Sequence, residues 1–150
     1  FNYGARKQSR ILETMRLSFL TAVSIMTFGC LLFEGIPQHF FALFHASDAM
    51  LAIGIPAFRI IGLGFPLAGF SIACSSVFQA LGKGVYSMIV SICRQLLVLL
   101  PAAYLLSRSG VLSRVWWAFS IAEGAAFLLS AFFLWKVYHH ILLPLEEERP

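Results

Sequence analysis

The sequence predicts an all-α integral membrane protein, and three observations carry this prediction. Hydrophobic residues make up 59% of the 150 residues and charged residues only 12%, with a mean hydropathy of +0.83. Four apolar runs follow one another along the chain, and the Lys and Arg residues between them fall mostly on alternate sides. A bilayer core needs about 20 apolar residues of helix, so we expect four spans, at residues 17–33, 60–81, 86–106 and 115–138.

The first span is preceded by the densest basic cluster of the chain, Arg6, Lys7, Arg10 and Arg16. Basic residues are enriched on the cytoplasmic side of membrane proteins, which places this end in the cytoplasm. Alternation then puts seven basic residues inside and two outside. The inside residues are Arg6, Lys7, Arg10, Arg16, Lys83, Lys136 and Arg149, and the outside residues are Arg108 and Arg114. We therefore predict a multi-pass protein of the cell membrane with both ends of this chain cytoplasmic.

Between the first two runs, Pro37 is expected to end the first helix because proline lacks the N–H that continues a helix. A short apolar group follows and predicts an interfacial segment, since it cannot cross a bilayer. Asp48 occupies the position expected for the N-cap of the next helix.

The second run combines Pro66 with Gly62, Gly64 and Gly69, a pattern that indicates a hinge or a closely packed helix face. Further along the same run, polar residues recur at about one helical turn. This stripe either lines a cavity or forms hydrogen bonds between helices. It consists of Ser71, Ser75, Ser76 and Gln79.

The third and fourth runs each contain one deep charge, Arg94 and Glu123. A charge at the centre of a membrane helix costs at least about 2.5 to 3.5 kcal/mol, so such residues usually face a partner or water. With a rise of about 1.5 Å per residue, Arg94 lies roughly 12 Å into its span from the cytoplasmic side, and Glu123 lies a similar depth from the outside. We predict that the two meet, either as a static pair that fixes packing or as a coupling site.

Several classes of function find no support in the sequence. It contains no nucleophile with a base, no phosphate-binding loop and no carboxylate pair at working spacing, so no enzyme activity is predicted. The four histidines and three cysteines form no metal-binding spacing, and no cofactor is expected. The basic residues are dispersed between apolar runs, which argues against a nucleic-acid partner.

Four motifs, in this order, resemble the second half of the multidrug and toxic compound extrusion (MATE) transporters and match their last four transmembrane helices. The motifs are residues 2–5 (NYGA) with the basic cluster, residues 78–83 (FQALGK), Arg94-Gln95 followed by Pro101, and residues 115–123 (VWWAFSIAE). The resemblance implies a twelve-helix transporter of two six-helix lobes. Since the chain lacks an initiator Met, we expect it to be the C-terminal part of a longer protein, and the resemblance implies that this part is the end of the second lobe.

The resemblance also implies a function, which is export of amphipathic or cationic drug-like compounds in exchange for entering H⁺ or Na⁺. Its expected partners are these compounds, membrane lipids and the N-terminal lobe of the same protein. Some family members place a coupling Asp in the helix that matches residues 60–81, but that run contains no acid here. The resemblance therefore leaves open that the coupling carboxylates belong to the N-terminal lobe. Glu123 is the only deep acid available in this chain and is a candidate for contact with a proton or a substrate. The other pathway candidates are Arg94, Gln79, Ser75 and Gln95.

Two alternatives remain open at the level of sequence. One is a flippase of the same broad superfamily that moves a lipid-linked sugar, which would need a large cationic cavity. The other is a membrane scaffold without transport, in which the polar residues only hold helices together.

Overall fold

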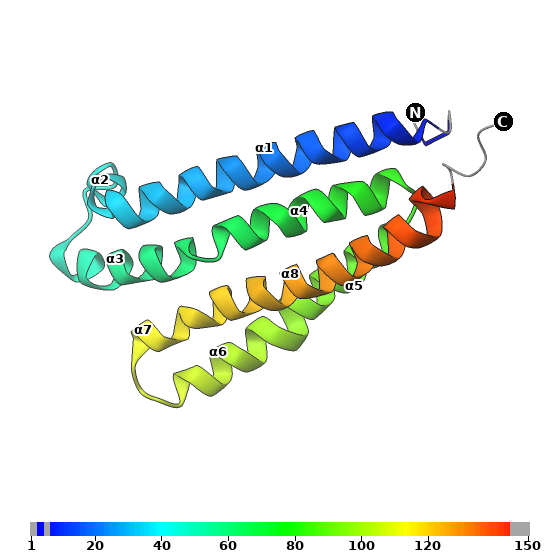
Figure 1. Cartoon of the computed structure of the whole chain (residues 1–150). Helices are drawn as coiled ribbons and strands as arrows, with labels where there is room; N and C mark the ends of the chain where they lie inside the picture. The colour runs from blue at the N-terminus through cyan, green and yellow to red at the C-terminus, as the bar shows by residue number, and fades with distance from the viewer. Residues whose placement is uncertain (1–2, 5–6, 145–150) are drawn as a thin grey trace.

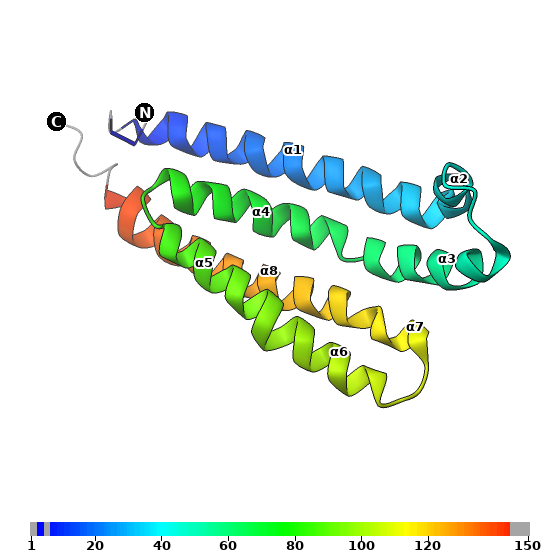
Figure 2. The same ribbon diagram turned by 180° about the vertical axis from the view of Figure 1, so that it is seen from behind.

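Long antiparallel helices make up the structure, a computed structural model that describes residues 3–4 and 7–144. Figure 1 shows α4 between α1 and α8, and Figure 2, from behind, shows α5 beside α8. The elements in chain order are α1 (Gln8–Gly35), α2 (Pro37–Ala42), α3 (Asp48–Gly62), α4 (Phe65–Ala80), α5 (Gly84–Ile92), the π-helical η1 (Cys93–Leu99), α6 (Leu100–Ser107), α7 (Leu112–Val115), α8 (Trp117–Val137) and the π-helical η2 (Tyr138–Leu142).

Three continuous helical stretches are long and apolar enough to cross a membrane: Gln8–Gly35, Gly84–Ser107 and Leu112–Leu142. A fourth span results if α3 and α4, which are bent by 51° at a short break, are counted together. The described residues contain no β-strand. The predicted fold class, an all-α membrane protein, is confirmed.

The helix boundaries differ from those expected from the apolar runs. The first helix begins at Gln8 rather than at residue 17, because a helix continues past its apolar stretch where water or headgroups can solvate its polar side chains. The run at residues 60–81 is not one helix, since α3 begins at Asp48 and the helix breaks between Gly62 and Phe65. Arg6 and Arg149 of the charge count, and Asn2 and Ala5 of the first motif, lie outside the described residues.

The prediction that Asp48 caps the second helix was wrong by one residue. Ser47 is the N-cap, with an extended backbone, and its Oγ accepts a hydrogen bond of 3.3 Å from the Met50 N–H. Asp48 is instead the first residue of α3, where its negative charge favours the helix N-terminus. Pro37 begins α2 directly after α1 ends, as expected of a proline that stops one helix and starts another.

Small residues spaced four apart form one buried face of α8. They are Ala118, Ala122, Ala126 and Ser130, each no more than 2% exposed. Small side chains on one helix face let two helix backbones approach closely within a membrane. α8 packs against both α4 and η1.

Aromatic stacking joins the helices at both ends of the bundle. Tyr86 of α5 stacks on Phe133 of α8 with ring centroids 4.5 Å apart and planes inclined by 5°. At the other end, Phe33 of α1 stacks on Phe58 of α3 at 4.2 Å. Gln8 donates a 3.0 Å hydrogen bond to the Leu142 carbonyl, so the start of α1 and the end of η2 lie at the same end of the bundle.

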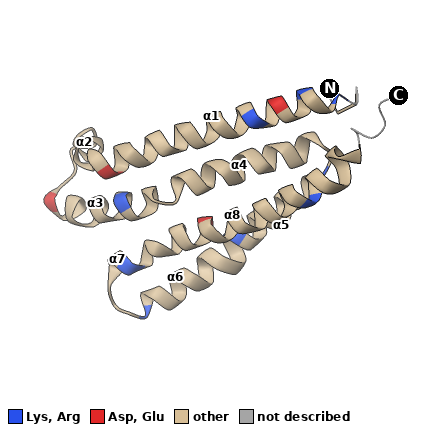
Figure 3. Ribbon diagram, viewed as in Figure 1, with Lys and Arg blue, Asp and Glu red and all other residues tan. Residues whose placement is uncertain are grey.

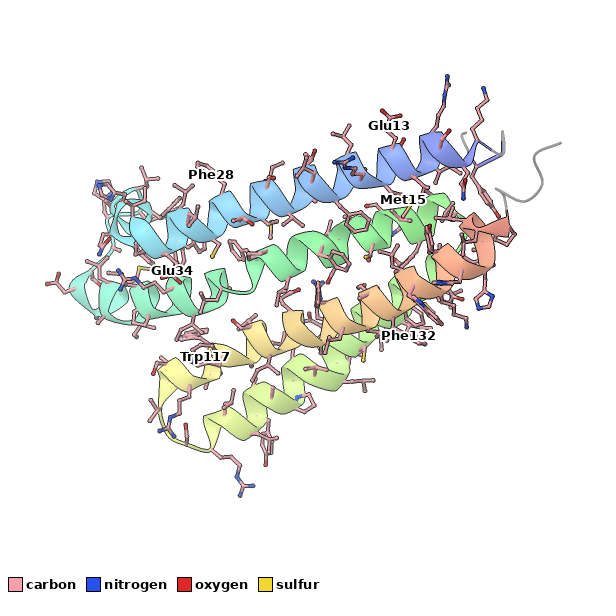
Figure 4. The ribbon with its side chains drawn as sticks, viewed as in Figure 1. Glu13, Met15, Phe28, Glu34, Trp117 and Phe132 are labelled. Atoms are coloured by element: carbon pink, nitrogen blue, oxygen red, sulfur yellow. The ribbon has the colours of Figure 1, made fainter. Side chains whose placement is uncertain are left out.

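The outward face of α1 is apolar along most of its length. Leu17, Leu20, Ile25, Phe28 and Leu31 are each 63–64% exposed. Figure 4 shows Phe28 and Glu13 pointing away from the bundle, whereas Met15 points toward α4. Such a continuous apolar face suits lipid or further transmembrane helices rather than water.

Gly69 permits the contact between α1 and α4. A Cβ atom at this position would lie 2.9 Å from the Ala22 carbonyl oxygen and 3.0 Å from the Met26 Cγ. We expect Gly69→Ala to destabilise the protein by about 1–3 kcal/mol, because the backbones must separate. The measurement is thermal unfolding of the full-length protein in detergent. Gly124→Ala is the matched control, since a Cβ there meets no atom within 4 Å. Equal stability of the two variants would contradict the prediction.

Candidate functional site

Arg94 and Glu123 form an ion pair inside the helix bundle. The Arg94 Nη1 donates a hydrogen bond of 3.2 Å to the Glu123 Oε1, and the side chains are 34% and 20% exposed. Figure 3 shows the acidic segment of α8 and a basic segment of the facing helix far from both ends of the bundle. The predicted contact between these two charges is therefore present. Whether it acts in coupling stays a prediction.

Arg94 lies on η1, where the third span is wound as a π-helix. Pro101 follows shortly after, at the start of α6. Because proline has no N–H, the Leu97 carbonyl lacks the donor that a continuous α-helix would supply. A π-helical turn changes the direction in which its side chains project, and π-turns occur frequently at functional sites.

Glu123 packs against the break between α3 and α4. A Cβ on Gly64 would lie 3.2 Å from the Glu123 Cγ and 3.3 Å from the Ile61 carbonyl oxygen. The carboxyl-bearing side chain therefore occupies space that exists because residue 64 is glycine. The sequence pattern indicated either a hinge or a close-packing face here. The structure shows close contacts at Gly64 and Gly69 and a 51° bend at this break, while motion at the break stays a prediction.

Ser120, one turn before Glu123, compensates for a hydrogen bond that the break removes. In a continuous helix the Gly64 N–H would bond to the Ile60 carbonyl, but it donates to the Ile61 carbonyl instead, at 3.0 Å. The Ser120 hydroxyl donates to the Ile60 carbonyl at 2.7 Å. Buried backbone carbonyls are rarely left unpaired, so this bond attaches α8 to the broken helix beside the ion pair.

One oxygen of Glu123 has no partner. Its Oε2 is buried and forms no hydrogen bond within the described part of the chain, whereas Oε1 binds Arg94. An unpaired buried acceptor costs about 1–3 kcal/mol, or more when it is charged. A proton or a cation bound at Oε2 would remove this cost, which gives the group the chemistry of an ion-binding carboxylate.

A polar hollow of about 280 Å³ lies between α4 and the helix formed by α5 and η1. Three of the five predicted pathway residues, Ser75, Gln79 and Arg94, line it. Gln95, the next residue along η1, is exposed and is not among the lining residues. The full lining is Ser71, Ile72, Ser75, Ser76, Gln79, Ser87, Val90, Ser91 and Arg94.

The polar stripe on α4 serves both roles that the sequence left open. It lines the hollow, and it also supplies hydrogen bonds between helices, because Gln79 Nε2 donates to Ser87 Oγ at 3.1 Å. Ser87 in turn donates to the Ser75 carbonyl at 3.3 Å. Ser71 and Ser76 instead donate to carbonyls of their own helix.

Sequence reasoning missed Ser87, Ser91 and Ser120, and it did not connect Gly64 with Glu123. Ser120 stands three residues before Glu123, a spacing that puts both on one helix face and could have drawn attention to it. Ser87 and Ser91 are four apart on the helix that follows the polar stripe. Only the packing of α5 against α4 brings them to the same hollow as Ser75 and Gln79.

Within residues 3–4 and 7–144, no three His, Cys, Asp or Glu side chains are grouped closely enough to hold a metal ion. Cys30, Cys74 and Cys93 are free thiols in this part of the chain.

The chain is similar to known proteins in sequence and in structure. Residues 1–105, more than half of the chain, match the MatE family. The chain belongs to the MatE family. One solved structure, protein A, is similar to the chain with a TM-score of 0.82 and 32% sequence identity. No curated protein matches this chain significantly.

The similarity to this solved structure covers 91% of this chain but only 31% of the solved protein. This chain therefore spans about a third of the length of the protein it matches. Members of the MatE family are membrane transporters, which agrees with the membrane-spanning helices described above. The family match thus bears out the resemblance that the motifs suggested.

Proposed function

We propose that this MatE chain is the C-terminal part of the second lobe of a secondary transporter. The complete protein would export amphipathic or cationic compounds in exchange for entering H⁺ or Na⁺. Family membership and the 31% coverage of a longer relative support the proposal. In this view the exposed apolar face of α1 packs against lipid or against the remaining helices of the same protein.

The observation that carries the proposal is the buried, unpartnered Glu123 Oε2 beside Arg94. Charges this deep in a membrane protein usually mark an ion or substrate pathway. When a proton or cation binds Oε2, the attraction between Glu123 and Arg94 weakens. An ion that binds one arrangement of the helices more tightly than the other shifts the population toward that arrangement.

The break at Gly64 offers the moving part for such a shift. Glu123 contacts it directly, and Ser120 holds the freed Ile60 carbonyl. Discontinuous helices with ion sites at the break recur in secondary transporters. A cationic substrate that reaches Glu123 would compete with the coupling ion for the same carboxylate.

The sugar-lipid flippase has less support. It requires a wide cationic cavity, whereas the polar hollow measures about 280 Å³ and Arg94 is the only Lys or Arg among its lining residues. The scaffold alternative gives no reason for an unpartnered carboxylate oxygen next to a helix break.

The test is transport by the full-length protein in proteoliposomes under an imposed pH gradient or an imposed sodium gradient. We expect a cationic dye to be exported in response to at least one gradient, and Glu123→Gln to reduce gradient-driven export more than about tenfold. The control is Glu13→Gln, since Glu13 is exposed and points away from the bundle. Export that ignores both gradients would overturn the proposal.

The proposed orientation, with both ends of the chain in the cytoplasm of the cell, has its own test. In a full-length variant without native cysteines, Ser9→Cys should resist a membrane-impermeant maleimide added outside intact cells. Ser109→Cys, in the turn after α6 at the opposite end of the bundle, should react. Labelling at position 9 from outside would reverse the orientation.

A further inference from the structure

We infer that the polar hollow between α4 and α5 is a binding site for a small carboxylate ligand, held by Arg94 in competition with Glu123. This inference does not depend on which compound the transporter exports or on the coupling ion.

The charge of the hollow favours an anion. Arg94 is the only charged residue that lines it among the described residues, and the other polar groups are hydroxyls and one amide. Glu123, the partner of Arg94, is not part of the lining. A guanidinium in a polar recess with no acid of its own attracts an oxyanion more strongly than a cation or a neutral ligand.

Unused donors in the hollow give the ligand its hydrogen bonds. A guanidinium has five N–H donors, and Arg94 uses one for Glu123 within the described chain. The hydroxyls of Ser75 and Ser91 make no hydrogen bond in that part of the chain, and Gln79 donates to Ser87 alone. Donors without acceptors are the complement of a carboxylate, which only accepts.

The ion pair leaves Arg94 available for a second carboxylate. Its contact with Glu123 is a single hydrogen bond of 3.2 Å rather than the paired bonds of a fork. Bidentate guanidinium–carboxylate contacts are stronger than single ones. A ligand that engages two N–H groups from the hollow would therefore draw Arg94 away from Glu123.

The size of the hollow limits the ligand. Drug-sized ligands occupy pockets of about 300–1,000 Å³ and one water about 30 Å³. A volume of about 280 Å³ suits a molecule with one carboxylate and a small apolar body. Ile72 and Val90, which are apolar lining residues, would contact that body.

The experiment uses the full-length protein in nanodiscs of neutral lipid and measures binding by titration calorimetry. Benzoate is the probe and benzamide, its uncharged isostere, is the matched ligand. We expect benzoate to bind at least about tenfold more tightly than benzamide, as a charge-assisted contact predicts. Equal binding of the two would overturn the inference.

Two substitutions at the ion pair are expected to change the affinity for benzoate in opposite directions. A purely structural role of the pair would not produce opposite changes. Arg94→Gln should weaken benzoate binding more than about tenfold, whereas Glu123→Gln should tighten it several-fold by releasing Arg94. Ser91→Ala, an exposed position with little risk to folding, should weaken binding a few-fold. The control Arg108→Gln, after α6 and outside the hollow, should change nothing.

A last comparison tests whether the hollow binds a soluble carboxylate or a lipid headgroup, since both are anions. Benzoate binding that persists when anionic lipid replaces neutral lipid supports the inference. Loss of benzoate binding in anionic lipid would assign the hollow to a lipid phosphate and overturn it. Weaker binding in Glu123→Gln would also overturn it. Gradient-driven dye export, measured on the same variants, reports separately on the proposed transport function.

Discussion

Reversing the charge of either Arg94 or Glu123 is expected to destabilise the protein by about 3–5 kcal/mol, and exchanging the two should restore most of that loss. Arg94→Glu and Glu123→Arg each place like charges where the structure has an ion pair of 3.2 Å between half-buried side chains. An uncompensated charge at this depth is costly because water cannot solvate it fully. The measurement is denaturant unfolding of the full-length protein in detergent.

The double substitution provides the decisive comparison, because it keeps the pair while exchanging the positions of the charges. Glu13→Arg is the control, since Glu13 is exposed and should change stability by less than about 0.5 kcal/mol. A double variant that is no more stable than the weaker single variant would show that the contact does not hold the helices together. Transport by a stable double variant then separates the two roles: full export indicates a static pair, and lost export indicates that the carboxylate must lie beside Gly64.

Filling the space at Gly64 should have the second largest effect. A Cβ at this position meets the Glu123 Cγ at 3.2 Å and the Ile61 carbonyl oxygen at 3.3 Å. The larger side chain of Gly64→Leu would displace Glu123 from Arg94, and we expect export to fall more than about tenfold with a loss of about 1–3 kcal/mol of stability. Gly64→Ala should fall between this variant and the wild type.

The backbone of Gly64 itself does not require glycine. Its φ of −75° and ψ of −17° are right-handed helical values that any residue adopts, so the effect of substitution comes from the side chain alone. Gly35→Leu is the matched control, because a Cβ at Gly35 meets no atom within 4 Å. Equal export by Gly64→Leu and Gly35→Leu would show that transport does not depend on the position of Glu123 at the break.

The sequence determined the class of this protein through properties that depend on neighbouring residues alone. Apolar runs of membrane-spanning length, separated by basic residues, predict helices in lipid whatever their arrangement. The isolated charges Arg94 and Glu123 also predicted their own pairing, because a deep charge without a partner is too costly to leave alone. That contact was confirmed at 3.2 Å.

Other features depended on how the helices are rotated and packed, and only the tertiary structure decided them. Successive residues of a helix project in different directions, so on η1 Arg94 lines the hollow while Gln95 lies outside it, a difference that hydropathy cannot register. The break at Gly64 is occupied by Glu123 and compensated by Ser120, both from a helix more than fifty residues away in the sequence. The hollow likewise exists only because Ser87 and Ser91 of one helix face Ser75 and Gln79 of another. Local composition sets which segments enter the membrane, whereas contacts between distant segments set which polar groups meet there.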